Sequence, residues 1–272
     1  MHIVIYTSDS RSSSDNYNIS HLLNQRKNHK FSFVIVKKKV VPVSLWLRFK
    51  RFIVDVRDGK NHWVDDLEAL NKKINTRTLS FDLGNFDTYY VHSVNDSESE
   101  NIITQLQPDI ILQAGAGILK NNIFSLAKKA TINVHHGLAP DIRGIKSTFW
   151  CLYYGLTDLI GVTCHKIDKN LDTGAILSQY RYPYTLGDSF LKVQEVLCQK
   201  GLELLIEAVD IIDAHTIFES VTEEVTSYYF SNVDRSDYNA LKANGFLAVK
   251  QNEIANLKTK KKIKTIIKPE LY

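Results

Sequence analysis

Three polar side chains in the middle of the chain have the types needed to move a proton and to stabilise a negative charge. Asn133 and His135 stand two positions apart at the end of the apolar run 131–134, and Asp172 lies in a polar segment after residue 167. Because side chains alternate along an extended segment, Asn133 and His135 point to the same side. That side presents an amide donor and an imidazole to one small substrate, and the Asp172 carboxylate could orient the imidazole and stabilise its protonated form.

These side-chain types fit a nucleophilic attack on a carbonyl carbon. The tetrahedral state of that reaction carries an oxyanion, and losing one preorganised donor to an oxyanion typically costs about 2.7–4 kcal/mol. It also carries a surplus proton, and a positioned base with a pKa near the working pH contributes about 10²–10⁴ in rate. Histidine is the side chain whose unperturbed pKa meets that demand. The reaction needs no metal ion.

Taken alone, the Asn-x-His pattern is a weak signal, since a single histidine is more often structural and a single loop aspartate more often forms a turn. One alternative is a nucleotide-binding module, because Gly115-x-Gly117 follows an apolar segment. That pair lacks the third glycine and the acidic residue about 20 positions further on that a dinucleotide fingerprint requires. A second alternative is a metal-dependent hydrolase with the candidate ligands His135, His136, His165 and Asp172. Adjacent histidines on a strand point to opposite faces, which disfavours joint ligation.

The composition is typical of a soluble globular protein. Hydrophobic residues make up 44% and charged residues 24% of the 272 positions, which suits one sizeable α/β domain plus a smaller appendage, or two compact domains. The net charge of +4 does not by itself imply a nucleic-acid partner. Three cysteines without CxxC spacing disfavour disulfides and structural zinc. Because it has neither a signal-peptide pattern nor an apolar stretch of about 20 residues, the chain is predicted to be cytoplasmic and to lack a membrane span.

Short apolar runs alternate with helical patterns along most of the chain. Strands are predicted at residues 2–6, 31–36, 89–94, 109–113, 131–134 and 161–167. Helices are predicted at residues 19–24, 45–56, 63–74, 96–106, 118–128 and 189–214. This alternation predicts an α/β fold with a Rossmann-like open, mostly parallel sheet and helices on both faces. In such sheets ligands bind beyond the carboxyl ends of the strands, where Asn133 and His135 are expected.

The chain is predicted to divide at residue 187. Residues 1–187 would form the catalytic domain, and residues 188–272 a small C-terminal α+β extension. That extension would contain the long helix, short β-like segments at 220–230, a short helix at 238–244 and a basic tail. Residues 45–56 form a basic amphipathic pattern that could lie on a membrane surface, although a helix packed on its own sheet is the commoner arrangement.

A longer pattern surrounds the three polar residues. It is formed by Asn133, His135, Leu138, Pro140, Arg143 and Gly144, and then by Leu171, Asp172 and Gly174. The segment 107–178 resembles the catalytic core of the folate-dependent formyltransferases, whose motif reads Asn-x-His-x-(small)-Leu-x-Pro-x-x-(Arg/Lys)-Gly and then (Leu/Ile)-Asp-x-Gly. The family includes glycinamide ribonucleotide, methionyl-tRNA and sugar-nucleotide N-formyltransferases. Residues 95–96, 108–111 and 115–119 also look like the family.

The resemblance implies a Rossmann-like fold, 10-formyltetrahydrofolate as co-substrate and no metal. In such enzymes the folate lies between the corner after strand 109–113 and the loop that carries Asp172. By position, Asn133 would hold the formyl oxygen, His135 would assist proton transfer, and Asp172 would position the imidazole or accept a proton. The expected folate contacts are Ile118 and Leu119 beside the pterin and the backbone of Asp168, Lys169, Asn170 and Leu171. Apolar residues that open a helix are also common in cores, so a core position for the first two stays open.

The loop after His135 departs from the family pattern. Gly137 stands where family members often carry serine, and residues 147–148 are Ser-Thr where they often carry proline. The loop on the substrate side is therefore remodelled. The motif thus predicts the type of reaction better than it predicts the amine that accepts the formyl group. The expected substrate contacts are His136, Arg143 and Trp150. An ion pair with Asp141 is an equal alternative for Arg143, and a surface or packing role is the commoner one for His136.

The amine that accepts the formyl group is predicted by analogy with members of the family. A tRNA substrate would favour a well-formed second domain and a broad basic surface, whereas a short stretch with one basic tail follows residue 214. A purine-pathway enzyme would be shorter than this chain. The length resembles the sugar-nucleotide N-formyltransferases most, so the expected substrate is a nucleotide-linked amino-deoxysugar used in surface glycan biosynthesis, such as that of lipopolysaccharide O-antigen. A nucleic-acid partner is disfavoured, methionyl-tRNA is the alternative acceptor, and a homodimer stays open.

Overall fold

The computed structural model describes residues 1–8, 28–37, 86–170, 172–214 and 227–231, and single residues at 19, 233, 237, 240, 241, 243 and 245. The predicted helices at 45–56 and 63–74 and the basic tail lie outside these residues. So do residue 171 and most of the segments 19–24, 220–230 and 238–244. Within the described residues, no helix is long and apolar enough to cross a membrane.

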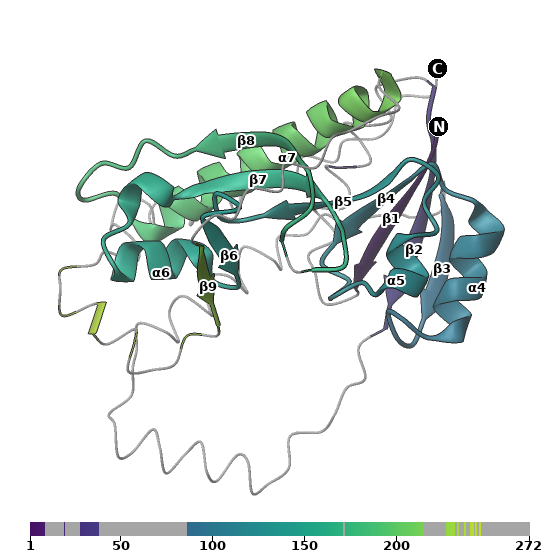
Figure 1. Ribbon diagram of the computed structural model, residues 1–272, viewed down its shortest axis with the longest axis horizontal. Helices are drawn as coiled ribbons and strands as arrows, with labels where there is room; N and C mark the ends of the chain where they lie inside the picture. Colours follow the sequence, from purple (N-terminus) through teal and green to yellow (C-terminus); the bar gives the residue numbers. More distant parts are fainter. Residues whose placement is uncertain are drawn as a thin grey trace, which may run out of the picture.

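A seven-stranded sheet forms the centre of the molecule (Figure 1). Its order is β3-β2-β1-β4-β5-β7-β8. Its strands are β1 His2–Ser8, β2 Lys30–Val36, β3 Asp87–Val91, β4 Ile110–Ala114, β5 Ala130–His135, β7 Gly161–Lys166 and β8 Ile176–Arg181. The pairs from β3 to β5 are parallel, and β7 is antiparallel to both β5 and β8. The prediction of a Rossmann-like, mostly parallel α/β sheet is confirmed. The side chains of β8 are exposed or only partly buried, so no apolar run reveals that strand in the sequence.

Both faces of the sheet are covered, which explains why its inner strands are nearly continuous apolar runs. In β1, Ile3 belongs to one core cluster and its neighbour Val4 to the other, because successive side chains point to opposite faces. The first cluster includes residues of α7, Phe190–Ala214, and the second includes residues of α4, Ser97–Leu106, and α5, Asn121–Phe124. Figure 1 shows α7 apart from α4 and α5, which lie together at the other end of the sheet.

The long helix α7 begins where the sequence predicts it. The Ser189 hydroxyl accepts a hydrogen bond from the Lys192 backbone N–H at 3.1 Å, a cap that is typically worth about 1 kcal/mol. Helix α7 packs on β5, β7 and β8, so it covers the part of the sheet that carries Asn133 and His135. The division of the chain at residue 187, which assigns this helix to the C-terminal extension, stays a prediction.

The helix predicted at 118–128 is wrong in its extent, because α5 covers only Asn121–Phe124. The residues before α5 form a non-helical corner that is tied to a distant side chain. The Asn95 amide donates to the Ile118 carbonyl at 2.9 Å and accepts from the Lys120 N–H at 2.7 Å. These bonds use backbone groups that an earlier helical turn would need. A long-range contact thus outweighs the local apolar pattern.

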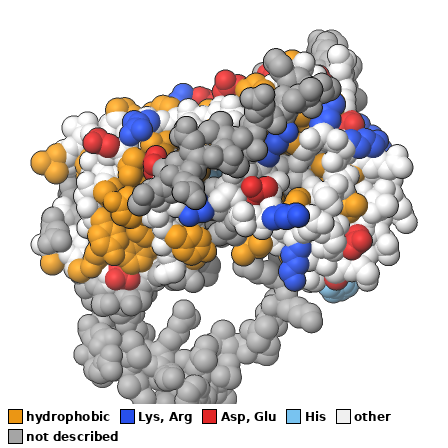
Figure 2. Space-filling model, in the orientation of Figure 1, with side chains coloured by type: hydrophobic (Ala, Val, Ile, Leu, Met, Phe, Trp, Pro, Cys, Tyr) orange, Lys and Arg blue, Asp and Glu red, His pale blue; other side chains and the backbone are white. Residues whose placement is uncertain are grey.

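A small two-stranded sheet borders the segment that follows His135. Strand β6, Ile142–Gly144, pairs in parallel with β9, Tyr228–Phe230, and α6, Ser147–Tyr153, follows β6. Figure 2 shows hydrophobic side chains gathered on the left of the face, in the area where Figure 1 has α6 and β9. Exposed large apolar side chains in and beside these elements are Ile145, Tyr154, Tyr228 and Tyr229. Strand β9 thereby attaches the C-terminal part of the chain to the loop that the sequence marks as remodelled.

Candidate active site

The segments that carry Asn133, His135 and Asp172 meet through a hairpin and not through two parallel strands. Strand β7 runs antiparallel to β5, with His165 opposite Asn133. The carboxyl end of β7 therefore lies away from the carboxyl end of β5. The loop between β7 and β8 has to fold back over the sheet before Asp172 can reach His135.

Polar contacts within this loop give it its shape. The Asp168 carboxylate accepts a hydrogen bond from the Thr173 hydroxyl at 2.8 Å. Gly174 passes so close to β7 that a Cβ atom there would lie 1.8 Å from the Lys166 carbonyl oxygen, so only glycine fits. Asp172 itself has a φ of 53°, a region that aspartate adopts more readily than most residues. The loop thus holds the Asp172 carboxylate over the end of β5.

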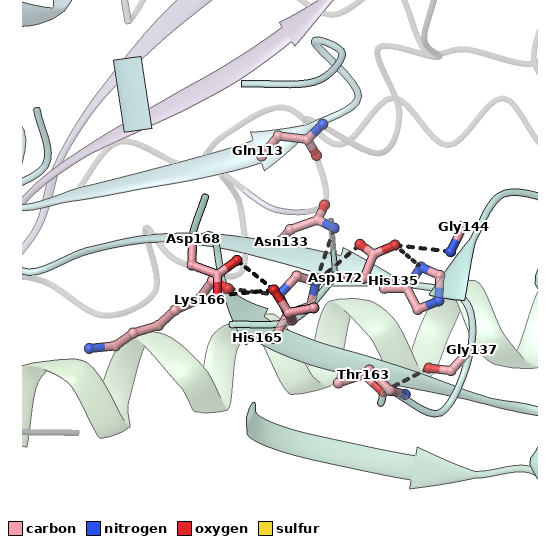
Figure 3. Close-up of polar contacts among 12 residues, drawn as sticks. Gln113, Asn133, His135, Gly137, Gly144, Thr163, His165, Lys166, Asp168 and Asp172 are labelled. Carbon is pink, nitrogen blue, oxygen red and sulfur yellow. Dashed lines mark hydrogen bonds and ion pairs between the residues drawn. The ribbon is translucent and has the colours of Figure 1, made fainter. Parts of the chain in front are cut away.

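His135 is buried and contacts a different group with each ring nitrogen. Figure 3 shows its contact with Asp172. Nε2 lies 3.0 Å from the Ile142 carbonyl oxygen, and Nδ1 lies 3.6 Å from Asp172 Oδ2. A carbonyl oxygen only accepts, so Nε2 donates and the neutral ring keeps its lone pair on Nδ1. Asp172 Oδ2 is held by the Gly144 backbone N–H, which donates to it at 3.2 Å. A proton taken up at Nδ1 would therefore lie beside the carboxylate, which favours the imidazolium.

The two partners have pKa values suited to base catalysis. Burial lowers the pKa of His135 below its usual value, against the opposing effect of Asp172. Burial by itself would raise the pKa of the Asp172 carboxyl, but the two imidazoles, His165 and His135, in their protonated forms and the Gly144 N–H outweigh burial and lower that pKa. At neutral pH His135 is therefore an uncharged base beside a charged carboxylate. Such a base is free to take a proton, and its protonated form is stabilised where it forms.

Asn133 lies next to His165, and these two residues form one cluster with His135 and Asp172. Asn133 Nδ2 lies 3.4 Å from His165 Nε2, and that nitrogen lies 3.5 Å from Asp172 Oδ1. Figure 3 shows the Asp172 carboxylate between the two imidazoles, with Asn133 close to His165. The sequence singles out His165 only as a candidate metal ligand. The signal that places it here is the pairing register of β5 with β7, which is a property of the sheet.

The corner after β4 separates the two apolar residues that are expected to flank a pterin. Ile118 is 69% exposed, whereas Leu119 is buried in the core cluster that includes residues of α4 and α5. The Gln113 side chain, which the sequence does not single out, donates to the Gly117 carbonyl at 2.9 Å and holds the corner. The corner therefore presents Ile118 to the outside, and Leu119 anchors it from within.

The loop residues that are expected to contact folate also differ from one another. Lys169 and Asn170 are exposed. Asp168 is partly buried, and its carboxylate accepts from the Asn170 N–H at 3.1 Å as well as from Thr173. Leu171 lies outside the described residues. The Asp168 side chain thus stabilises the loop, independently of any contact that the Asp168 backbone makes with folate.

The residues that are expected to contact the acceptor connect β6 and α6 with β9. Trp150 is buried, and its ring stacks on Phe230 with 5.7 Å between the ring centroids. Arg143 donates through Nη2 to the Ser227 hydroxyl. His136 is partly buried next to His135. Trp150 and Arg143 therefore help to position the small sheet that borders the site.

The Gly137 position is needed for the observed placement of the His135 ring. A Cβ atom there would lie 2.6 Å from His135 Nε2 and 3.0 Å from Ile142 Cγ2. We expect the substitution Gly137→Ala to push the ring off the Ile142 carbonyl and to lower kcat by about 10²-fold, the loss that a misplacement of roughly 1 Å can cause. Steady-state kinetics and thermal denaturation of the purified variant measure the two effects separately.

Gly187→Ala is the matched control for this substitution. Nothing lies within 4 Å of a Cβ atom at Gly187, although its φ is +89°. The control is therefore expected to lose some stability and to keep its turnover. An unchanged kcat in the Gly137→Ala protein would contradict the argument that this glycine positions His135.

The alternative metal site has no donor set among the described residues. In that part of the chain, no group of three or more His, Cys, Asp or Glu side chains is arranged to hold a metal ion. Both imidazoles of the cluster instead direct one nitrogen to a backbone carbonyl, His135 to Ile142 and His165 to Lys166. The cluster is thus arranged around a carboxylate and its protons.

A family model described as formyl transferase matches residues 50–209, which include all four residues of the cluster. The chain belongs to the formyl transferase family. A methionyl-tRNA formyltransferase from Kosmotoga olearia is 32% identical over 146 residues, which are 53% of this chain and 47% of that protein. The chain thus spans about half the length of this relative.

Solved structures of the family share the fold. A sugar N-formyltransferase from a Shewanella species superposes with a TM-score of 0.56 at 18% identity, over 89% of this chain and 86% of that one. Glycinamide ribonucleotide transformylase 1 from Symbiobacterium toebii gives a TM-score of 0.54 at 14% identity, over 80% and 91% of the two chains. At these identities the two structures establish a common architecture.

Proposed function

We propose that this chain transfers a formyl group from 10-formyltetrahydrofolate to a primary amine. The observation that carries the proposal is an uncharged imidazole whose Nδ1 lies 3.6 Å from the Asp172 carboxylate, in one cluster with the Asn133 amide. Amine formylation needs a proton acceptor and an oxyanion donor at one place. Membership of the formyl transferase family supports the same reaction class.

Each of the three side chains has a separate task in the proposed reaction. The Asn133 amide donates a hydrogen bond to the formyl oxygen as that oxygen gains negative charge. His135 takes the surplus proton of the attacking amine at Nδ1, and this proton then passes to the amine of tetrahydrofolate as its bond to the formyl carbon breaks. Asp172, held by the Gly144 N–H, stabilises the imidazolium that results. His135 is buried, so these charges act with less screening than they would have in water.

The folate would supply the formyl group, and the corner after β4 together with residues 168–170 would hold it. Ile118 is a large apolar side chain that is 69% exposed beside the polar backbone of Gly117. An apolar contact with polar groups around it suits a flat ring with hydrogen-bonding edges, such as a pterin. Exposure of Lys169 and Asn170 leaves the loop open to a ligand as well.

For the acceptor we propose a nucleotide-linked amino-deoxysugar. The fold likeness to a sugar N-formyltransferase over 86% of that chain supports this choice. The face formed by α6 and β9 also supports it, because exposed rings such as Tyr154 and Tyr228 suit a sugar or a base better than a phosphate backbone. Sequence likeness to a methionyl-tRNA formyltransferase supports the alternative acceptor. A place in surface glycan biosynthesis goes with the sugar acceptor.

A screen of acceptors tests the proposal. The purified protein is incubated with 10-formyltetrahydrofolate and a panel of nucleotide-linked amino sugars, with initiator methionyl-tRNA as the competing substrate. A product heavier by one formyl group in mass spectrometry is expected for an amino sugar. Formylation of methionyl-tRNA instead would select the alternative. Absence of product with every amine, together with no heat of binding for 5-formyltetrahydrofolate, would reject formyl transfer altogether.

The pH dependence of the reaction should reflect a neutral His135. Because only the uncharged ring accepts a proton, kcat/KM is expected to rise with pH through the His135 pKa and to level off above it. Burial lowers that pKa below the usual 6.5, so the midpoint of the acidic limb is expected below pH 6.5. Calorimetry with 5-formyltetrahydrofolate over the same range controls for loss of folate binding. A midpoint above 6.5 would mean that the ring is held as an imidazolium.

A further inference from the structure

His165 contacts both Asn133 and Asp172 in the cluster, although the proposed reaction gives it no task. Its side chain is 3% exposed, and the residue stands opposite Asn133 in the register of β5 and β7. Nδ1 lies 2.7 Å from the Lys166 carbonyl oxygen. Nε2 lies 3.4 Å from Asn133 Nδ2 and 3.5 Å from Asp172 Oδ1. One nitrogen of the ring thus faces both the amide and the carboxylate.

The contact with Lys166 determines which nitrogen of the neutral ring is the acceptor. A carbonyl oxygen only accepts, so Nδ1 carries the hydrogen and Nε2 has the lone pair. Ionised Asp172 has no hydrogen to give to that lone pair. The Asn133 amide supplies one, and it does so only with Nδ2 turned toward the ring. The chain of contacts from the Lys166 carbonyl through His165 therefore selects one orientation of the amide.

The two ends of an amide have opposite effects on an oxyanion. In the observed orientation, Nδ2 uses one hydrogen on His165 and keeps the second for the formyl oxygen. If the amide turned around, Oδ1 would take the place of Nδ2 and would repel the growing negative charge. We propose that His165 is a positioning residue, which holds the Asn133 amide in the orientation that donates to the formyl oxygen. This inference rests on the proposed function.

A double-mutant cycle tests whether His165 acts through Asn133. His165→Leu removes the acceptor and is expected to lower kcat by about 10²–10³-fold, the loss that follows removal of an oxyanion donor, with little change in KM for the amine. His165→Gln keeps an acceptor oxygen near the position of Nε2 and is expected to recover most of the activity. In an Asn133→Ala background, His165→Leu is expected to cause no further loss, since residues that act as a unit are not additive.

Two outcomes of the kinetics would overturn the proposal. The first is an undiminished effect of His165→Leu in the Asn133→Ala background, which would mean a role unrelated to the amide. The second is non-additivity with Asp172→Asn in place of Asn133→Ala, which would mean that His165 acts through the carboxylate. Circular dichroism and recovery by His165→Gln separate both outcomes from simple unfolding.

A measurement without turnover tests the same contacts. Nitrogen-15 NMR of the imidazoles, recorded in the wild-type protein at a pH where the rings are neutral, is expected to show the His165 hydrogen on Nδ1. The Asn133 side-chain amide signal is expected to shift in the His165→Leu protein. A hydrogen on Nε2 of neutral His165 would overturn the proposal. Because this result is independent of catalysis, it is distinct from a failure of the wild-type protein to formylate any amine, which would reject the proposed function.

Discussion

Replacing His135 with alanine is expected to lower kcat by about 10²–10⁴-fold, the range that a positioned general base contributes. The imidazole is uncharged, and its Nδ1 lies 3.6 Å from Asp172 Oδ2, so removing the ring removes both the proton acceptor and the stabilised site for the proton. The corner after β4, which we propose as a folate contact, is not touched by this change. Calorimetry is therefore expected to show binding of 5-formyltetrahydrofolate with little loss of affinity, and single-turnover kinetics to show a slow chemical step.

His92→Ala is the matched control for the loss of an imidazole. The His92 ring is 70% exposed and lies 3.2 Å from Glu98 on the surface, and an exposed contact of this kind contributes little to stability. The control is expected to keep wild-type turnover and stability. Substantial activity in the His135→Ala protein would remove His135 from the mechanism, whereas loss of folate binding would indicate a structural role.

Replacing Asp172 with asparagine is expected to lower kcat by up to about 10⁴-fold, the loss seen when the carboxylate partner of a catalytic histidine becomes an amide in serine proteases. Asparagine keeps an oxygen for the Gly144 N–H, which donates at 3.2 Å, so β6 is expected to stay in place. What disappears is the negative charge that stabilises protonated His135. Loss of that charge also lowers the pKa of His135 further, since Asp172 raises it in the wild-type protein.

The residual activity of the Asp172→Asn protein carries a second expected result. The acidic limb of its kcat/KM profile should move to lower pH than in the wild-type protein. With a lower pKa, His135 becomes protonated only in more acidic solution. Asp213→Asn is the matched control, since Asp213 is half-exposed at the end of α7 and pairs with Lys129 at 3.6 Å. Wild-type turnover in the Asp172→Asn protein, or a limb moved to higher pH, would contradict the proposed electrostatic role.

Local patterns predict the buried strands of the sheet because burial on both faces leaves an apolar run in the sequence of each such strand. In β1 and β4 most side chains are buried on one face or the other, and an apolar run bounded by polar turns is what such burial requires. The helix at 118–128 fails for the opposite reason. Its periodicity is real, but the Asn95 side chain holds the backbone of Ile118 and Lys120 in a corner. A contact across more than 20 residues has no periodicity to reveal it.

The sequence by itself determined that Asn133 and His135 share one side of a strand end, because the alternation of side chains along a strand is local. It also determined, through the motif around them, that the chain resembles the formyltransferases. Only the tertiary structure decided that β7 is antiparallel, that its loop folds back to bring Asp172 to His135, and that His165 completes the cluster. Strand register sets these contacts. It depends on how distant segments pair across the sheet, and no spacing along the chain contains that information.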